Sequence, residues 1–351
     1  MSADLDQVIE GSSDGVLDIQ EFFNKVTLEI AGLAIMGERL GKLRSRDKGL
    51  TFEQCYTRIL SPDPIGIAIT FLQVWIPLRW LPIKANRDHF EADREIRSMI
   101  MDLIEKRRAE ALADDKAGGN VSSRRDVLSK TVAANLNDKF ISDQELMDIL
   151  VQFIIAGHET IARALAWLMS ELVRHPEVVA RLRQEIAEAR AKQPVLDRLT
   201  VEGLPYLHNV IRESLRLYTT ATMVSWEAIQ NVVVEGVVIP KGTLVHLVPR
   251  LMNRKHAVWG KDADEFNPDR WDHLNEYSGD AFAFQTFLNG PRICPGVPLV
   301  MLEMRVLCLE LVEKFNFELA DPNKVITDCH PSISLKIKDG LPLRFQRRAA
   351  E

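Results

Sequence analysis

One cysteine lies in a segment of the chain that is well suited to hold a thiolate. Residues 287–296 read Phe-Leu-Asn-Gly-Pro-Arg-Ile-Cys-Pro-Gly, and two glycines and two prolines in ten residues exclude a regular helix or strand. The apolar run that begins at Val297 predicts a helix, so Cys294 lies just before a helix N-terminus. Unpaired N–H groups and the helix dipole favour an anion at such a position. We therefore interpret Cys294 as a candidate thiolate ligand of a metal.

The spacing of the residues around this cysteine carries a resemblance. The pattern Phe287-x-x-Gly290-x-Arg292-x-Cys294-x-Gly296 resembles the haem-binding signature of the cytochromes P-450, in which the cysteine is the axial ligand of the haem iron. The resemblance implies haem as the cofactor, Cys294 as its metal ligand and the other four residues as its surroundings. The alternative is a buried free cysteine in a loop rich in Gly and Pro, and it leaves the spacing to coincidence.

A long helix with an unusual middle is predicted upstream of this loop. Ser142 and Glu145 form a capping box, and apolar residues keep a helical period from there to His175, which gives a rod of roughly 50 Å. Its middle, residues 156–160, reads Ala-Gly-His-Glu-Thr, where a purely structural rod would carry large apolar residues. Small residues three and four apart share a helix face. We expect a shallow notch there, with one hydroxyl in it.

This notch resembles the Ala-Gly-x-Glu-Thr segment in the central helix of the same family. The resemblance implies that Thr160 and Glu159 deliver protons during oxygen activation and that Ala156 and Gly157 lie beside the haem. A packing notch against another helix is the alternative. A zinc site of the His-Glu-x-x-His type is not supported, because position 162 is Ala and His158 would lack its second imidazole.

Three charged residues resemble the structural network of the family. Glu213 and Arg216 are three apart on a helix predicted over 204–217, and Arg270 follows in the segment Phe-Asn-Pro-Asp-Arg-Trp. The resemblance implies that the buried Glu213–Arg216 pair locks the segment before the cysteine loop and that Arg270 completes the network. The planar guanidinium of arginine suits this role, because it can serve a carboxylate and backbone carbonyls together.

Composition limits the class of protein. Of the 351 residues, 46% are hydrophobic and 27% charged, which is typical of a globular chain. The formal net charge of −6 argues against a nucleic-acid partner. The four cysteines show no Cys-x-x-Cys spacing, which excludes the usual zinc ribbons and suits a reducing compartment. Residues 65–83 are apolar but interrupted by prolines, and we interpret them as a surface flap that contacts a membrane peripherally.

The predicted fold class is mainly α with small β-sheets (α+β). The resemblance implies the cytochrome P-450 fold as a single domain over residues 1–351 that is incomplete at its N-terminus. Residues 113–120 contain two adjacent glycines and are expected to form a flexible loop. The other elements predicted from apolar periodicity are helices over 18–38, 49–60, 86–112 and 177–192 and hairpin strands over 232–248 and 332–345.

The chain departs from the family pattern in two places. The family has an early helix whose Trp-x-x-x-Arg contacts the haem propionates; Trp75 and Arg79 have this spacing, but they lie in the flap and Pro77 between them would break a helix. Trp226 stands where the family usually carries an Arg that pairs with a propionate. Arg292 remains as the propionate-binding candidate. The variants of the motifs are typical of a eukaryotic, fungal member.

The resemblance implies a haem-thiolate monooxygenase that uses O₂ to hydroxylate a small apolar molecule. No Gly-x-Gly-x-x-Gly opens a helix in the chain, so we expect electrons from a separate NADPH-dependent cytochrome P-450 reductase. A complete family member would reside on the cytoplasmic face of the endoplasmic reticulum membrane, and this chain, which shows no anchor, would be cytoplasmic. Two alternatives stay open: isomerase or peroxygenase chemistry, and a non-catalytic fragment that binds haem weakly or not at all.

Overall fold

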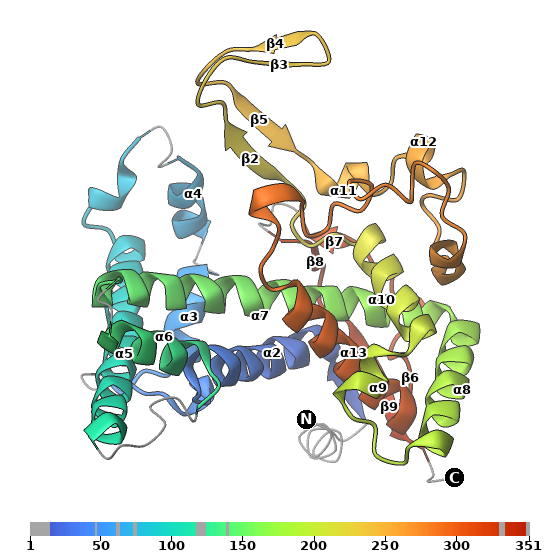
Figure 1. The fold of residues 1–351 in the computed structure, drawn as a ribbon, viewed down its shortest axis with the longest axis horizontal. Coiled ribbons are helices and arrows are strands. Elements are labelled where there is room, and N and C mark those ends of the chain that lie inside the picture. Colours follow the sequence, from blue (N-terminus) through green and yellow to red (C-terminus); the bar gives the residue numbers. More distant parts are fainter. Residues whose placement is uncertain are drawn as a thin grey trace. The chain divides into compact units, whose positions relative to one another are not determined.

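The computed structural model describes residues 15–45, 48–60, 64–72, 76–116, 124–137, 140–329 and 334–348. The fold is mainly α with small antiparallel sheets, as predicted (Figure 1). The chain forms two compact units, one of Met1–Val26 with Glu159–Glu351 and the other of Thr27–His158. Two helices, α2 (Ile19–Met36) and α7 (Asp143–Arg174), contribute residues to both units.

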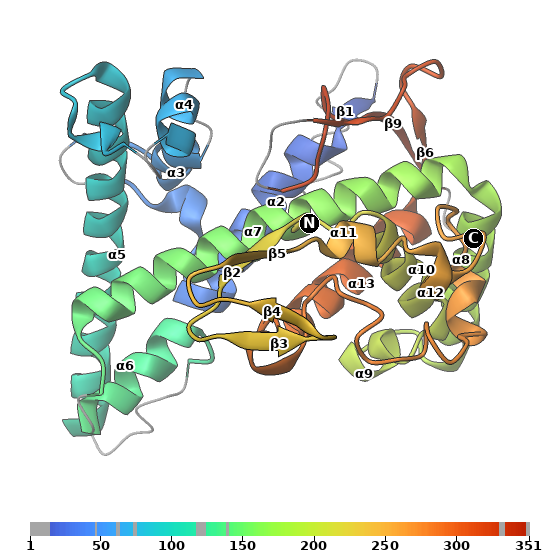
Figure 2. The ribbon, with the colours of Figure 1, turned by 90° about the horizontal axis from the view of Figure 1, so that it is seen from above.

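The unit of residues 27–158 is helical throughout its described part. The long helix α5 (Lys84–Lys116) packs against α3 (Phe52–Leu60), α4 (Pro64–Leu72) and α6 (Val127–Asn137), and both ribbon views show α3 and α6 beside it (Figures 1 and 2). Side chains such as Phe52, Ile100 and Leu128 fill the core between these helices and α7. Its further elements are η1 (Leu40–Lys42), α3 (Phe52–Leu60), α4 (Pro64–Leu72), η2 (Leu78–Trp80) and α6 (Val127–Asn137).

Most helix ends in this unit follow local signals in the sequence. Helix α2 ends before Gly37, which has φ +68° and therefore takes the left-handed conformation that terminates helices. The capping box of α7 is present, since the N–H of Ser142 donates to Glu145 at 2.9 Å and the N–H of Glu145 donates to the Ser142 hydroxyl at 3.2 Å.

The predicted end of α5 needs a correction. We expected this helix to end near Leu112, but it continues to Lys116, so the first residues of the loop predicted over 113–120 are helical. Neither Gly nor Pro occurs between Leu112 and Gly118. A helix that is already formed extends at little cost through a stretch without these residues. The rest of the predicted loop, 117–120, lies outside the described residues.

The larger unit contains the second half of α7 and most of the other helices. Helix α13 (Val297–Lys314) packs against α8 (Pro176–Lys192), α9 (Arg198–Glu202) and α10 (Pro205–Leu217), and both ribbon views show α13 beside α10 (Figures 1 and 2). Proline is the first residue of α8 and of α10, a position at which its missing N–H costs no hydrogen bond. Short helices follow α10: α11 (Pro249–Met252), α12 (His256–Trp259), η3 (Pro268–Asp272) and η4 (Gly290–Arg292).

Within the described part of the chain all the strands belong to this unit, and they form one three-stranded and three two-stranded sheets. The predicted hairpin region 232–248 contains β3 (Val232–Val234), β4 (Val237–Ile239) and β5 (Leu244–Leu247). In Figure 1 the β3–β4 hairpin extends beyond the ladder that β5 forms with β2 (Val224–Glu227). The remaining strands are β1 (Val16–Asp18), β6 (Phe315–Leu319), β7 (Asp328–Cys329), β8 (Lys336–Ile337) and β9 (Pro342–Arg347).

The prediction of β structure near the C-terminus was incomplete. Strand β9 begins inside the predicted region 332–345 and ends two residues after it. It pairs with β1 and β6, which the sequence pattern did not reveal. Strand β1 is only three residues long, and β6 follows α13 without a turn, so the helical period of α13 hides its start. Residues 332 and 333 lie outside the described residues.

Candidate functional site

The cysteine loop turns back on itself directly before α13. The N–H of Cys294 donates to the carbonyl oxygen of Phe287 at 2.9 Å, which closes the loop. Two residues inside it have left-handed backbone conformations, Leu288 with φ 58° and Gly290 with φ 71°. Such a conformation is strained for leucine, so contacts with the surrounding structure must impose it. Gly296 then caps the N-terminus of α13.

The groups of this loop are accessible. Cys294 is a half-buried free thiol, and Arg292 is exposed and makes no ion pair with the described residues. Phe287 packs edge-on against Phe284, with 6.2 Å between ring centroids. A Cβ added to Gly296 would lie 3.6 Å from the sulfur of Cys294, which is ordinary contact. A free thiol and a guanidinium without an ion-pair partner among the described residues thus lie two residues apart on one loop.

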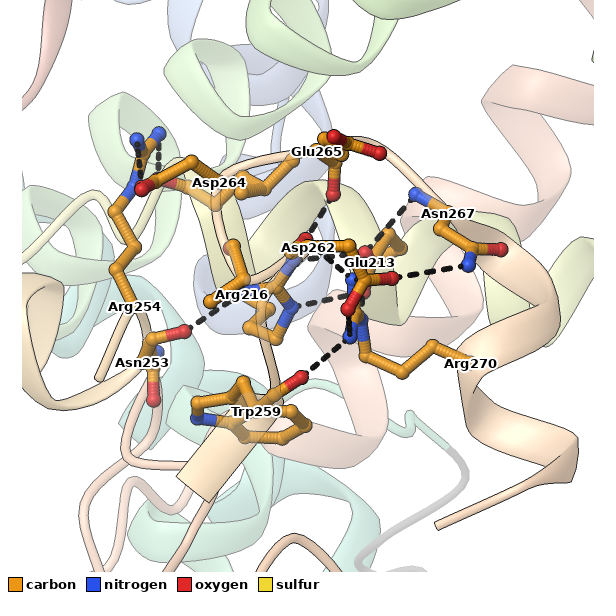
Figure 3. Close-up of polar contacts among 12 residues, drawn as sticks. Glu213, Arg216, Asn253, Arg254, Trp259, Asp262, Asp264, Glu265, Asn267 and Arg270 are labelled. Carbon is orange, nitrogen blue, oxygen red and sulfur yellow. Dashed lines mark hydrogen bonds and ion pairs between the residues drawn. The ribbon is translucent and has the colours of Figure 1, made fainter. Parts of the chain in front are cut away.

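Glu213 and Arg216 are in contact, and neither side chain has any exposed surface (Figure 3). The guanidinium of Arg216 donates to both carboxylate oxygens of Glu213, from Nε at 2.9 Å and from Nη2 at 2.8 Å. Its remaining N–H groups donate to the backbone carbonyls of Asn253, Ala263 and Glu265 at 2.8, 2.6 and 3.2 Å. One arginine therefore ties the end of α10 to three points of the segment that follows the hairpin strands.

Arg270 joins the same network from η3. Its Nε donates to Glu213 at 3.2 Å, while its two terminal nitrogens donate to the carboxylate and the backbone of Asp262 and to the carbonyl of Trp259. These hydrogen bonds from Arg270 lower the pKa of the Asp262 carboxyl below its usual value. The indole N–H of Trp271 also donates to Glu213, at 3.1 Å. The three residues predicted to form one network do so, because Arg216 and Arg270 both donate hydrogen bonds to Glu213.

Glu159 and Thr160 lie on the part of α7 that belongs to the larger unit. The carboxylate of Glu159 is paired with Arg163 one helical turn later, and it accepts a hydrogen bond from the hydroxyl of Ser334 at 3.4 Å. Arg163 also donates to the backbone carbonyl of Ser334. Trp167, one turn further, donates to the carbonyl of Leu335 at 2.9 Å. The predicted proton-delivery residue is thus held by a polar seam between α7 and the strand region before β8.

Ala156 and Gly157 lie on the part of α7 that belongs to the helical unit. Within that unit, a Cβ added to Gly157 would meet no atom nearer than Cδ1 of Ile35, at 4.0 Å, so the helix surface is hollow at this position. The next residue, His158, is buried; Nδ1 of its ring lies 2.9 Å from the hydroxyl oxygen of Tyr56. Among the described residues, no three His, Cys, Asp or Glu side chains are grouped so that they could hold a metal ion.

Comparison with known proteins decides the family. The model of the family described as Cytochrome P450 matches residues 1–343. The chain belongs to the cytochrome P450 family. It is 32% identical to the cytochrome P450 monooxygenase sphH of Aspergillus fumigatus over 95% of this chain and 62% of that protein. It is 31% identical to the cytochrome P450 monooxygenase FUM15 of Gibberella moniliformis over 94% of this chain and 63% of that protein.

A further relative is the cytochrome P450 monooxygenase 205 of Postia placenta, at 32% identity over 88% of this chain and 62% of that protein. All three are fungal, as the motif variants predicted. The chain spans less than two thirds of the length of each of these relatives.

The residues of this P450 chain fit the haem that is the cofactor of the family. Cys294 is a free, accessible thiol, and a thiolate is the protein ligand that haem iron has in P450 proteins. Arg292 can offer its guanidinium to a haem propionate because none of the described carboxylates occupies it. Trp226, which stands in place of a second propionate-binding Arg, lies in β2 and is 38% exposed. Arg79 lies in η2, and Trp75 lies outside the described residues.

Several residues around the site were missed by the sequence analysis. Arg163 could have been found, because it lies four residues after Glu159 and such pairs meet on a helix. Ser334 gave no signal, because its partners Glu159 and Arg163 are distant in sequence. By length and composition, α7 is the one helix in the described part of this P450 chain that could cross a membrane; core helices of soluble proteins pass the same test, and half of its apolar window is buried.

Proposed function

We propose that this chain is the haem-binding part of a cytochrome P450 monooxygenase in which Cys294 ligates the haem iron. The observation that carries the proposal is the accessible thiol of Cys294 just before α13, in a loop closed by its own N–H and next to Arg292, which makes no ion pair with the described residues. When bound, haem would supply dioxygen activation, and a thiolate ligand donates electron density that favours cleavage of the O–O bond.

The chain's own residues have separate parts in this proposal. Cys294 holds the cofactor, and Arg292 orients it through a charge-assisted hydrogen bond to a propionate. Thr160 and Glu159 hold and pass protons at the hydroxyl Oγ1 and at the carboxylate. The pairing of Glu159 with Arg163 keeps that carboxylate in one orientation. This function also requires electrons, and an NADPH-dependent reductase is the proposed donor.

The proposed substrate is a small apolar molecule, as is usual for the family. A membrane would be a source of such molecules, and the flap predicted over 65–83 offers a contact with it. This segment contains α4 and η2 and exposes several apolar side chains: Ile65, Leu72, Ile76 and Trp80. Clustered exposed apolar groups of this kind suit the interfacial region of a lipid bilayer. The location proposed for a complete family member, the cytoplasmic face of the endoplasmic reticulum membrane, rests on the family resemblance alone.

A difference spectrum of the reduced chain with carbon monoxide tests the haem ligand. We expect a thiolate-type Soret band that Cys294→Ser abolishes, because a serine hydroxyl does not replace the thiolate. Cys308→Ala is the control, since it removes a thiol that is buried inside α13. No thiolate-type band in the unmutated chain after addition of haem would contradict the proposal.

A non-catalytic fragment is the second candidate function. The chain spans less than two thirds of the length of each of the three relatives named above. The same difference spectrum separates the two candidates, because a fragment without a functional site would bind haem weakly and give no thiolate-type band.

A second experiment tests the role of Thr160. We expect Thr160→Ala to leave the thiolate-type spectrum unchanged but to divert reducing equivalents to hydrogen peroxide, because proton delivery and not ligation is lost. The measurement is product and peroxide formed per NADPH, with a substrate first identified by its spectral shift. Thr131→Ala on the exposed face of α6 is the control. Equal product per NADPH in the Thr160 variant and the parent would refute this role.

A further inference from the structure

A buried amide lies between the Glu213–Arg216 network and the cysteine loop. Asn253, the residue after α11, has no exposed surface. Its side-chain oxygen accepts from the N–H of Gln285 at 2.8 Å, and its side-chain nitrogen donates to the hydroxyls of Thr219 and Thr286, both at 2.8 Å. The side chain therefore connects the residue after α11 with the end of α10 and with the segment just before the cysteine loop.

The proton positions in this cluster are determined by its partners. The hydroxyl of Thr286 donates to the carbonyl of Leu215 at 2.9 Å, and the hydroxyl of Thr219 donates to the same carbonyl at 3.1 Å. Because each hydroxyl uses its own proton in this way, it accepts a hydrogen bond from Asn253. The Asn253 amide must therefore point its NH₂ group at the two hydroxyls and its oxygen at the N–H of Gln285. Asn253 and Thr219 are buried and Thr286 is half-buried, and a polar cluster in which every member is hydrogen-bonded resists movement because movement breaks these bonds.

Both ends of this cluster reach groups already described. The backbone carbonyl of Asn253 accepts from Arg216 at 2.8 Å, which joins it to the buried ionic network (Figure 3). At the other end, Gln285 and Thr286 directly precede Phe287, whose carbonyl accepts from the N–H of Cys294 at 2.9 Å. A continuous series of hydrogen bonds and peptide bonds thus runs from Arg216 through Asn253 to Cys294.

We propose that Asn253 is the positioning residue that transmits the rigidity of the Glu213–Arg216–Arg270 network to the Cys294 loop. The loop needs such support, because Leu288 takes a left-handed conformation that it would not adopt on its own. The proposal depends on the proposed haem function only for the role of Cys294 as the ligand. The placement of the loop itself is a property of the protein chain.

A matched pair of variants tests the proposal. Thr286→Val and Thr219→Val each remove one acceptor of the Asn253 amide and one donor to Leu215, but only Thr286 belongs to the segment that leads into the loop. The measurement is the rate at which iodoacetamide alkylates Cys294 in the full chain without added haem. We expect Thr286→Val to raise this rate about two- to tenfold, which corresponds to one neutral, partly buried hydrogen bond. Thr219→Val should raise it less.

Two other cysteines report whether the effect is local. Cys55 and Cys308 are fully buried, so their alkylation rises only when the chain unfolds more widely. We expect both to stay protected in Thr286→Val, and Thr286→Ser, which keeps the hydroxyl, to restore the parent rate at Cys294. Equal rates in the two valine variants, or a parallel rise at all three cysteines, would overturn the proposal.

Asn253→Asp gives a second test, because it keeps the shape of the side chain but loses both donors. We expect faster transfer of haem from this variant to an apo-globin acceptor than from the parent, and unchanged transfer would overturn the proposal. Alkylation of Cys308 would reveal whether this variant fails to fold. In that case the proposal is tested by the alkylation rates of Cys294 in Thr286→Val and Thr219→Val. The alkylation result stands whether or not the chain gives a thiolate-type spectrum, so failure of this inference and failure of the proposed function are distinguishable.

Discussion

Glu213 on α10 and Glu303 on α13 are both buried, but their surroundings differ. Glu213 has no exposed surface, and its two oxygens accept hydrogen bonds from Arg216, Arg270, Trp271 and the N–H of Asn267. Glu303 is 6% exposed, and its Oε1 has no hydrogen-bond partner among the described residues. Burial without a compensating charge raises the pKa of Glu303 to about 8.

This difference shows that burial alone does not decide what a carboxyl group contributes. The carboxyl group of Glu213 is bound by two guanidinium groups, so it holds the polypeptide around it in one arrangement. Glu303 is mostly protonated at neutral pH, and its buried oxygen lowers stability instead of raising it. The helix that follows Cys294 therefore contains a destabilising group, while the segment that precedes the cysteine loop is anchored by the ionic network.

The largest expected effect is the removal of one partner of Glu213. Arg216→Leu would leave the carboxylate of Glu213 buried with one guanidinium fewer and would free three backbone carbonyls. We expect the free energy of unfolding to fall by about 3–5 kcal/mol, the usual cost of breaking a buried ion pair. Urea unfolding followed by circular dichroism measures the loss.

An exposed pair of the same type is the control. Arg198 and Glu202 form an ion pair on the surface of α9, with the arginine side chain 67% exposed. Arg198→Leu should cost about 1 kcal/mol or less, because water screens such pairs. Similar losses for the two variants would show that the buried network is no more important to stability than a surface ion pair.

The opposite effect is expected for Glu303. In the unfolded chain this carboxyl titrates with its usual pKa of 4.5, whereas burial in the folded chain raises its pKa to about 8. Folding therefore takes up a proton between these pH values, and the stability of the parent falls as pH rises through this window. Glu303→Met removes both the titration and the unsatisfied oxygen. We expect it to raise the free energy of unfolding at pH 8 by about 2 kcal/mol or more.

The measurement is urea unfolding of parent and variant at pH 5 and pH 8. The gain in the variant should be larger at pH 8 than at pH 5. Glu310→Gln on the same helix is the control, since Glu310 is paired with Lys314 near the surface and should change stability little. A gain that is the same at both pH values would show that Glu303 does not titrate in this window.

Local sequence patterns were sufficient to predict part of the site and most of the helices. The Glu213–Arg216–Arg270 network could be predicted, because its members lie in short motifs that resemble those of a known family. The helices could be predicted from periodicity and from caps such as Ser142. Their ends were less certain, as α5 shows, because helix extension past Leu112 depends on the absence of a stop signal and not on a motif.

The rest depends on contacts between distant residues. The amide of Asn253 and the hydroxyl of Thr286 are 33 residues apart in sequence, and nothing near either residue indicates the other. Glu303 reads as an ordinary helix residue, because its burial follows from the packing of α13 against other elements and not from a local motif. Strands β1 and β6 form only because β9 pairs with both. Such features follow from packing and cannot be read from local patterns.

The smallest expected effect lies at the edge of the network, at Asp262. Its pKa is lowered chiefly by the hydrogen bonds from Arg270, so its contribution to stability is present above its unfolded value of 3.8 and is lost as pH falls through the lower folded value. The side chain is 38% exposed, and water therefore limits this contribution to about 1 kcal/mol or less. Asp262→Asn should lower stability at pH 7 by this amount and flatten the acid side of the stability profile, as urea unfolding between pH 3 and pH 7 would measure. Asp264, which is 57% exposed and paired with Arg254 and His256, should give a smaller change when replaced by Asn. Equal losses of stability in Asp262→Asn and Asp264→Asn would show that contact with the buried network does not increase the contribution of a surface carboxylate to stability. The anchoring role would then be confined to Glu213 and its direct partners.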